Sequence, residues 1–229
     1  MKRTQNFVEG RILPSLVSFA LPVLLALFLQ TMYGAVDMMI VGRFSQASEV
    51  SAVSTGSWIM QTITTAIVGL SMGTTILLGR RIGEKQPEEA GRVAGAGIWL
   101  FAWIGIVVTV VMQFLAVPAA GWMRAPMEAF DSTASYVRIC SAGAVFIVAY
   151  NVMGSIFRGL GNSRIPLISV SIACLVNIAG DLLLVGALGM ASAGAAIATV
   201  FAQVVSVVLS FAIIRKQELP FVFDRKSIR

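Results

Sequence analysis

The chain has 229 residues, of which 57% are hydrophobic and only 12% are charged, and its mean hydropathy is +0.86. Soluble domains carry about 25% charged residues, so the composition excludes an ordinary soluble domain, a disordered chain and a disulfide-rich secreted fold. The net charge is +6. We interpret the basic residues as anchors of loops on the cytoplasmic side of a membrane and not as contacts to nucleic acid. These numbers predict an all-α polytopic membrane protein.

Nearly charge-free segments that are long enough to cross a bilayer as helices follow one another along the chain, and a crossing takes about 20 residues. We expect six spans, at residues 15–41, 51–76, 93–117, 134–156, 166–186 and 194–214. The last two come from one apolar stretch, whose glycine-rich middle, Gly186–Gly194, predicts a tight turn. We therefore expect one six-helix transmembrane domain over residues 1–214 and a cytoplasmic segment over residues 215–229.

The basic residues test this count of spans. If the N-terminus is cytoplasmic, 14 of the 17 Lys and Arg residues lie in inside segments and only Arg43, Arg124 and Arg138 lie outside. Such a bias sets the orientation of membrane proteins, so we expect both termini in the cytoplasm of a multi-pass plasma-membrane protein. No small-residue cleavage site follows the basic N-terminus, and we expect no removable signal peptide.

Several residues within the spans carry structural information. Pro22 removes a backbone hydrogen bond inside the first span and favours a kink there. Small residues at Gly91–Gly97 and Ala193–Ala198 suit close approach of helices. Cys140 and Cys174 both fall in apolar segments, which indicates buried thiols and not a disulfide. The chain has no histidine, so histidine metal sites and Ser-His-Asp triads are excluded.

Two acidic residues, Asp37 and Asp181, lie inside predicted spans. A carboxylate near the bilayer centre costs about 2.5–3.5 kcal/mol on insertion scales, so such residues generally have a function. In surroundings of low dielectric, two neighbouring carboxyl groups can share one proton and titrate as a pair. The alternative is that both acids lie near the interfaces or serve only to hold helices together.

Asn177 precedes Asp181 by four residues, so both side chains lie on one face of the fifth predicted helix. An amide oxygen next to a carboxylate is a suitable ligand pair for a hard monovalent cation, and the same pair is neutral when it holds a proton. Thr199, in the sixth predicted span, can add a hydroxyl oxygen. We expect these residues with Asp37 to form a site for H⁺ or Na⁺, and no other cofactor.

Other polar side chains in the spans have a more ordinary interpretation, because a single one usually serves to join helices. They are Gln30, Tyr33, Gln61, Thr62, Thr64, Thr65, Tyr136, Asn151 and Gln203.

At this point an ordered set of segments resembles the multidrug and toxic compound extrusion (MATE) transporters. The first span reads FALPVLLALFLQTMYGAVDMMIVGR, the second-to-third connection GRRIGEKQPEEAGR and the fourth-to-fifth connection FRGLGNSRIP. The fifth span carries Asn-x-x-x-Asp at Asn177 and Asp181, and the sixth carries GAAIATV. Together these segments cover nearly the whole chain.

The resemblance implies an antiporter that exports organic, often cationic and amphipathic, compounds in exchange for Na⁺ or H⁺. It implies that the coupling site comprises Asp37, Asn177, Asp181 and Thr199. Tyr136 and Asn151 match positions in the polar network around that site, and Gln30 and Tyr33 match positions that face the substrate cavity. The resemblance also implies that bending of the first helix at Pro22 couples protonation to release of the substrate.

Members of this family have twelve helices in two lobes, whereas this sequence predicts six. Its last residues, Pro220–Lys226, resemble the segment that joins the two lobes. We therefore expect an N-terminal lobe that needs a missing C-terminal lobe or a second half-chain. The sequence is compatible with a fragment, a truncated product or half of a two-chain transporter.

Two other functions remain open from the sequence. A flippase for lipids or oligosaccharides has a related architecture, but such proteins often line their cavity with arginines, which are scarce in these spans. An intramembrane aspartyl protease also uses two membrane acids. However, the residues before Asp181, Ile178–Gly180, lack the first glycine of its GxGD signature, and Val36 stands where a tyrosine would precede the other acid.

Overall fold

The computed structural model describes residues 12–216, and within them every regular element is helical. The elements are α1 (Ile12–Phe44), α2 (Ala47–Gly83), α3 (Pro87–Trp122), a 3-10 turn η1 (Met127–Ala129), α4 (Phe130–Ala142), α5 (Ala144–Gly159), α6 (Arg164–Asp181), a π-helical segment η2 (Leu182–Ala187) and α7 (Ala191–Lys216). This all-α architecture confirms the predicted fold class. The predicted cytoplasmic segment lies outside the described residues, except for the last turn of α7.

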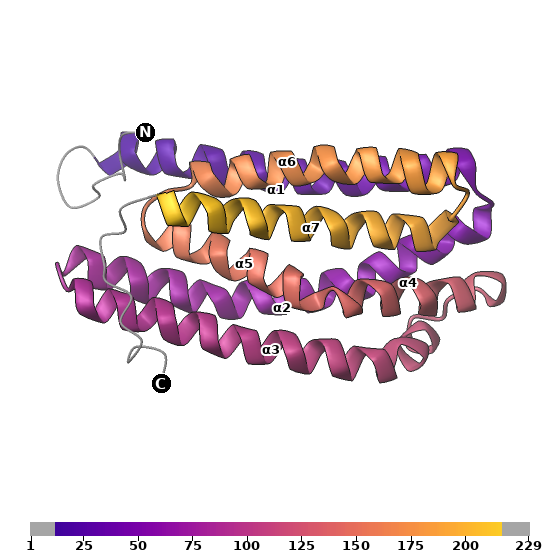
Figure 1. The fold of residues 1–229 in the computed structure, drawn as a ribbon, viewed down its shortest axis with the longest axis horizontal. Coiled ribbons are helices and arrows are strands. Elements are labelled where there is room, and N and C mark those ends of the chain that lie inside the picture. The colour runs from indigo at the N-terminus through magenta and orange to yellow at the C-terminus, as the bar shows by residue number, and fades with distance from the viewer. Residues whose placement is uncertain (1–11, 217–229) are drawn as a thin grey trace.

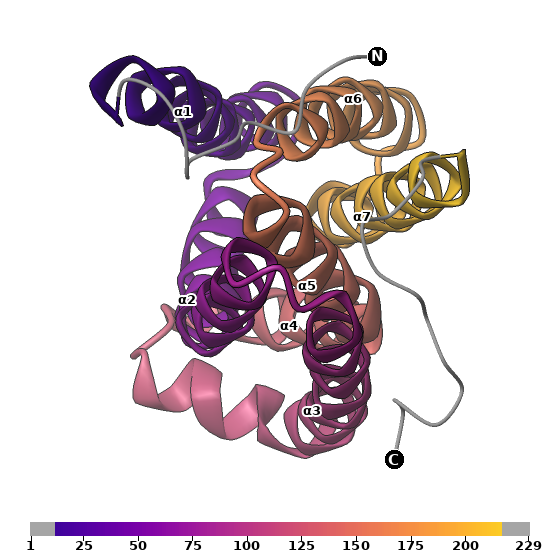
Figure 2. The same cartoon turned by 90° about the vertical axis from the view of Figure 1, so that its left-hand side faces the viewer.

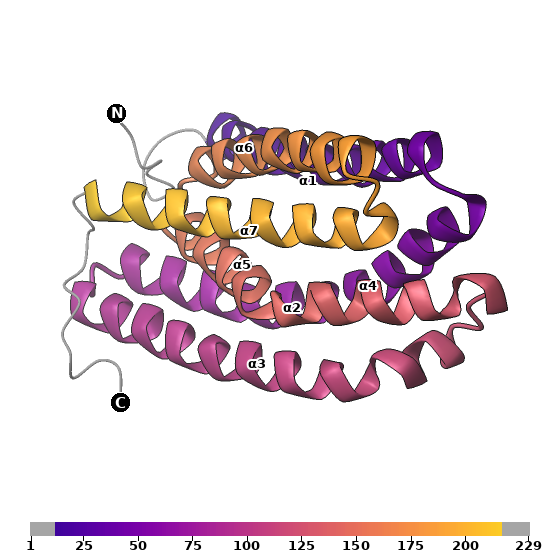
Figure 3. The ribbon, with the colours of Figure 1, turned by 45° about the vertical axis from the view of Figure 1, so that its right-hand side comes forward.

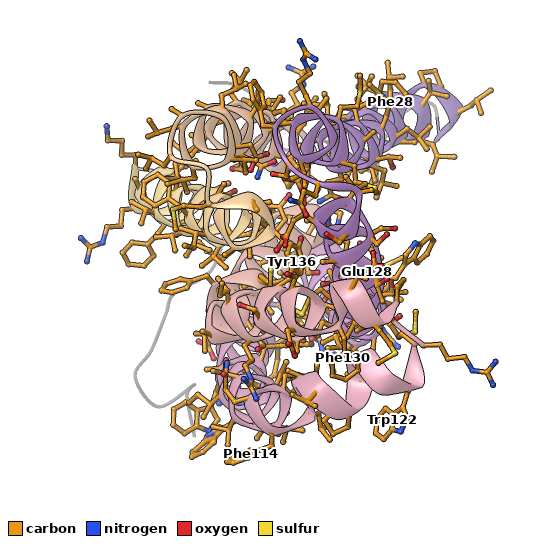
Figure 4. The ribbon with its side chains drawn as sticks, turned by 90° about the vertical axis from the view of Figure 1, so that its right-hand side faces the viewer. Phe28, Phe114, Trp122, Glu128, Phe130 and Tyr136 are labelled. Atoms are coloured by element: carbon orange, nitrogen blue, oxygen red, sulfur yellow. The ribbon has the colours of Figure 1, made fainter. Side chains whose placement is uncertain are left out.

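The long helices run back and forth between the two ends of the bundle, as Figure 1 shows. Five helical segments of the described chain are long and apolar enough to cross a membrane, and α4 with α5 supply a sixth as a bent pair. Large apolar side chains cover the outside of the bundle; Phe114, for example, is 79% exposed. In Figure 4, Phe28, Phe114 and Trp122 point away from the bundle. An apolar exterior of this kind suits lipid, so the chain is a multi-pass membrane protein.

The fourth predicted span is not one straight helix. The axis bends by 54° between η1–α4 and α5, as Figure 3 shows. The break lies at Gly143, where a Cβ atom would lie only 2.4 Å from Val200 Cγ1 on α7. The absence of a side chain therefore lets the bend contact α7 closely, a contact between residues far apart in sequence that hydropathy does not reveal.

The fifth span continues past Asp181 as η2, and the following turn is shorter than the predicted Gly186–Gly194. Gly189 has φ +65°, a left-handed conformation that glycine adopts without strain. The helix α7 begins at Ala191, three residues before the predicted start. π-Helical segments are often found next to functional sites, and this one directly follows a buried acid.

Two pairs of helices position the residues discussed below. Helix α1 packs mainly on α6, and α6 packs on α7. A Cβ atom on Gly180 would lie 2.9 Å from the Ala198 Cβ, so small residues set the close approach of α6 and α7. Helix α5 lies in the centre of the bundle, between the α2–α3 and α6–α7 pairs (Figure 2).

Candidate functional site

The two intramembrane acids are both buried and face each other. Asp37 lies on α1 and is 4% exposed, and Asp181 is the last residue of α6 and is fully buried. Their carboxyl groups are close enough to interact directly. The packing of α1 on α6 therefore brings together two charges that are 144 positions apart in sequence.

Several oxygens of the acid pair and of the neighbouring Asn177 lack a hydrogen-bond partner within the described residues. They are Oδ1 of Asp37, both carboxyl oxygens of Asp181 and the amide oxygen of Asn177. An unsatisfied buried polar atom costs about 1–3 kcal/mol, and more when it is charged. All four atoms are hydrogen-bond acceptors, so binding of protons or a cation there would remove this cost.

A third helix completes the cluster. The Asn177 side-chain nitrogen donates a hydrogen bond of 3.4 Å to Oγ1 of Thr199 on α7. This bond uses the amide nitrogen and leaves the amide oxygen without a partner within the described residues. Asp181 lies one turn further along the same face of α6. The structure thus brings Asp37, Asn177, Asp181 and Thr199 together from α1, α6 and α7.

A very small cavity of about 10 Å³ adjoins this cluster. Its lining includes Tyr33 of α1, Asn177 of α6, and Thr199 and Gln203 of α7. A cavity of this size holds about one water molecule. It therefore suits a small ion and has no room for a drug-sized molecule.

Gln203, which the sequence presents only as one of several polar residues in the spans, lines the pocket, and its side-chain oxygen is buried without a partner in the described chain. The sequence does indicate this position, because Gln203 follows Thr199 by four residues and therefore shares its helix face. It is a further acceptor beside the predicted coupling residues.

The other predicted site residues lie at varied distances from the acids. Tyr136 lies inside the bundle (Figure 4), where its hydroxyl and that of Ser57 share a hydrogen bond of 3.0 Å, and it interacts electrostatically with Asp37. The Gln30 side chain donates to the Tyr150 hydroxyl at 3.3 Å.

Among the described residues, Asn151 and Pro22 form no hydrogen bond with the acid pair. The Asn151 side chain donates to the Ile147 carbonyl of its own helix at 2.7 Å. Helix α1 remains continuous through Pro22. The role of Asn151 in the polar network and the role of Pro22 as a hinge therefore rest on the family resemblance.

The donor set determines which ions fit. The described residues contain no group of three or more His, Cys, Asp or Glu side chains that could hold a metal ion. Two carboxylates, an amide and a hydroxyl are all hard oxygen donors, which suit Na⁺, or a proton shared between the acids, and do not suit a transition metal.

Comparison with known proteins agrees with this architecture. The MatE family model matches residues 22–183. The probable multidrug resistance protein YoeA of Bacillus subtilis is 27% identical across 99% of this chain and 50% of its own length. The probable multidrug resistance protein NorM of Thermotoga maritima is 24% identical across 89% of this chain and 45% of its own.

Solved structures show the same relationship. A structure described as MATE in the bent conformation is 26% identical, with a TM-score of 0.89 over 98% of this chain and 51% of that one. An outward-facing multidrug resistance MATE transporter is 25% identical, with a TM-score of 0.89 over 100% of this chain and 51% of that one. The chain thus spans about half the length of the relatives it matches. It belongs to the MatE family, and its length is that of a single lobe of these proteins.

Proposed function

We propose that this chain is the ion-coupling lobe of an antiporter that exports organic, amphipathic and mainly cationic compounds in exchange for H⁺ or Na⁺. The observation that carries the proposal is the group of buried oxygens without partners on Asp37, Asn177 and Asp181, next to Thr199. The relatives named as multidrug resistance proteins support the class of substrate.

Antiport requires that the ion and the exported compound exclude each other. When the acid pair holds a proton or Na⁺, its charge is neutralised and the attraction for an organic cation falls. When the pair is empty, two carboxylates in a medium of low dielectric attract a cation strongly. Competition for one negative site therefore converts an ion gradient into export.

Helix α1 is suited to transmit this exchange. It carries Gln30, Tyr33 and Asp37, and Pro22 interrupts its hydrogen bonding two turns before Gln30. A helix that lacks one backbone hydrogen bond bends there at low energetic cost. Solved relatives are described in a bent and a straight conformation, which supports a hinge at Pro22 in this chain.

A second lobe is part of the proposal. Alternating access in transporters built from repeats needs two units that move against each other, and this chain supplies one. We propose that the partner is a C-terminal lobe or a second half-chain, that the complex lies in the plasma membrane, and that both ends of this chain are cytoplasmic.

Competition of ions with an organic cation tests the proposal directly on this chain. The purified chain in a maltoside detergent is titrated with ethidium by fluorescence anisotropy between pH 5 and pH 9, with either Na⁺ or choline as the only salt. We expect ethidium to bind more weakly at low pH, or in Na⁺, and the condition that weakens it identifies the coupling ion. Binding that is independent of both pH and Na⁺ contradicts the proposal.

A further inference from the structure

Arg158 stands near the end of α5, and its side chain folds back into the bundle. Arginines near the ends of membrane helices usually extend toward the aqueous interface. Here the guanidinium lies over Gly154, where a Cβ atom would be 3.3 Å from Nη1, and Nη2 donates to Oγ of Ser155 at 3.0 Å. The positive charge is thus held one turn deeper in the bundle than its Cα atom.

A directed chain of hydrogen bonds fixes the guanidinium in this place. The Ser155 hydroxyl that accepts from Arg158 donates to Oγ of Ser71 on α2 at 2.8 Å, and Ser71 donates to the Val68 carbonyl at 2.9 Å. Both serines are fully buried. Every partner in this series of hydrogen bonds is neutral, so the contacts orient the guanidinium without balancing its charge.

No carboxylate in the described part of the chain forms an ion pair with Arg158. Of the acids at the same end of the bundle, Glu84 pairs with Arg80 and Arg81, and Glu89 pairs with Arg92. Glu88 is exposed and forms no ion pair within the described residues. The half-buried guanidinium of Arg158 therefore keeps strong donors at Nη1 that form no hydrogen bond within the described residues.

A second donor lies near Arg158 on the same helix. The Tyr150 hydroxyl, two turns earlier on α5, interacts electrostatically with Arg158. It accepts a hydrogen bond from Gln30, so its own proton remains available to a ligand. The backbones of α1 and α5 are not in close contact over the described residues, and the Gln30–Tyr150 hydrogen bond links the two helices. Arg158 and Tyr150 therefore hold a guanidinium and a phenol close to each other on α5.

We propose that Arg158, with Tyr150 positioned by Gln30, is a subsite for the carboxylate or phosphate group of an amphipathic molecule. A guanidinium fork matches such oxyanions geometrically, and Tyr supplies a further donor. Helix α5 ends, close to Arg158, at the end of the bundle where α1 begins (Figure 1). Asp37 and Asp181 lie near the ends of α1 and α6, toward the opposite end of the bundle. A zwitterionic compound would therefore lie along the bundle, with its cationic part near the acids and its anionic part at Arg158.

The inference rests on the proposed function, because it extends the substrates of the same lobe from cations to zwitterions. Rhodamine 110, which carries a carboxylate, and its methyl ester rhodamine 123, which does not, form a matched pair of fluorescent probes. Their binding to the purified chain in phosphate-free maltoside detergent is measured by fluorescence anisotropy for the wild type and for Arg158→Gln, Arg158→Lys and Arg164→Gln. Arg164 is the matched control because it is exposed at the start of α6.

We expect Arg158→Gln to weaken binding of rhodamine 110 by at least about tenfold, as loss of a charge-assisted hydrogen bond does, and to change binding of rhodamine 123 by less than about twofold. Arg158→Lys should bind rhodamine 110 with intermediate affinity, and Arg164→Gln should match the wild type. Retained binding of rhodamine 123 shows that each variant is folded. Equal weakening of both dyes in Arg158→Gln, or no binding of rhodamine 110 to the wild type, overturns the proposal.

Two further arms separate the sources of the anion and the two proposals. If added phosphatidylglycerol displaces rhodamine 110 from the wild type at near-stoichiometric amounts, the oxyanion bound at Arg158 is a lipid phosphate; if it does not, the oxyanion belongs to a solute. If Asp181→Asn abolishes binding of rhodamine 123 but Arg158→Gln has no selective effect on rhodamine 110, the anion subsite is refuted and the proposed function stays intact. If Arg158→Gln weakens binding of rhodamine 110 selectively but Asp181→Asn leaves binding of both dyes unchanged, the cation site is refuted instead.

Discussion

At the scale of single residues, Asp181 is the most exacting part of the proposed coupling site, because it is fully buried and neither of its carboxyl oxygens has a hydrogen-bond partner in the described chain. Asp181→Asn replaces the charge by a neutral group of the same shape. We expect it to abolish the dependence of ethidium binding on pH or Na⁺, and to abolish ion-coupled efflux in an assembled two-lobe transporter. Asp37→Asn should impair both.

Membrane insertion should be unchanged in these variants, since a neutral amide costs less to bury than a carboxylate. Asp131→Asn is the control, because Asp131 is an exposed acid outside the cluster. Wild-type ion dependence in both Asp181→Asn and Asp37→Asn would refute the coupling assignment.

The acid pair could be predicted from the sequence because a charged residue in an apolar segment is visible without a structure. The position of Asn177 followed from helical periodicity alone. Local spacing places Gln203 on the helix face of Thr199, but neither its position in the pocket nor the inward fold of the half-buried Arg158 could be predicted in this way. Whether a polar side chain lies in a pocket or between helices depends on which helix faces it, and residues on α1, α5, α6 and α7 meet only through tertiary packing.

At the scale of helices, Gly143 permits the bend between α4 and α5 to contact α7. A Cβ atom there would meet Val200 Cγ1 at 2.4 Å and Cγ2 at 2.6 Å. We expect Gly143→Ala to destabilise the protein by about 1–3 kcal/mol, the usual cost of overpacking. Thermal unfolding in detergent measures the effect.

A double variant gives this prediction a sharper test. Val200→Ala removes the two methyl groups that cause the clash, so it should recover part of the stability lost in Gly143→Ala. Gly121→Ala is the control, because a Cβ atom there meets nothing within 4 Å. Additive losses in the double variant would show that the bend does not depend on this contact.

The start of α7 shows a different limit of sequence analysis. Ser192 is the second residue of that helix, and its backbone N–H has no partner within the helix. It donates to Oε2 of Glu49 on α2 at 3.1 Å, while Oε1 of Glu49 accepts from the Ser132 hydroxyl on α4 at 2.7 Å. One carboxylate thus joins three helices, and no local pattern predicts a capping residue 143 positions away.

We expect Glu49→Ala to lower the free energy of unfolding by about 1–3 kcal/mol, because two hydrogen bonds to a charged acceptor are lost. Thermal unfolding monitored by intrinsic fluorescence would measure this. Glu88→Ala, at an exposed position in α3, should have little effect. A similar stability for Glu49→Ala and the wild type would mean that water replaces the carboxylate without loss.

At the scale of the whole molecule, the spans were predictable because hydropathy and loop charge are summed over many residues, and errors at single positions cancel. The orientation remains a prediction, and labelling of cysteines tests it. In a background with Cys140→Ser and Cys174→Ser, Met127→Cys places a thiol at a position that is 97% exposed, in the predicted outer connection. Glu88→Cys places one in the predicted inner connection.

A membrane-impermeant maleimide added to intact cells should label the cysteine at position 127 and not the one at position 88, and permeabilised cells should show both labelled. This follows from the 14 of 17 basic residues assigned to the inside. The reverse labelling pattern would show that the topology is opposite to the one predicted. The acid pair would then face the other side of the membrane from the one expected.

The same whole-molecule view limits what this chain can do alone. Its six crossings form a lobe that buries the acid pair by itself, so ion and dye binding should survive without a partner. Transport additionally requires a second unit against which the lobe can move. Liposomes that contain only this chain, loaded with ethidium and given a pH or Na⁺ gradient, should therefore show no efflux above empty liposomes.

A complete two-lobe MATE transporter in parallel liposomes is the positive control, and crosslinking in the same sample reports the oligomeric state. Efflux by chains that remain monomeric would contradict the requirement for two lobes, whereas efflux that rises with the fraction of dimer would identify a second copy of this chain as the missing half.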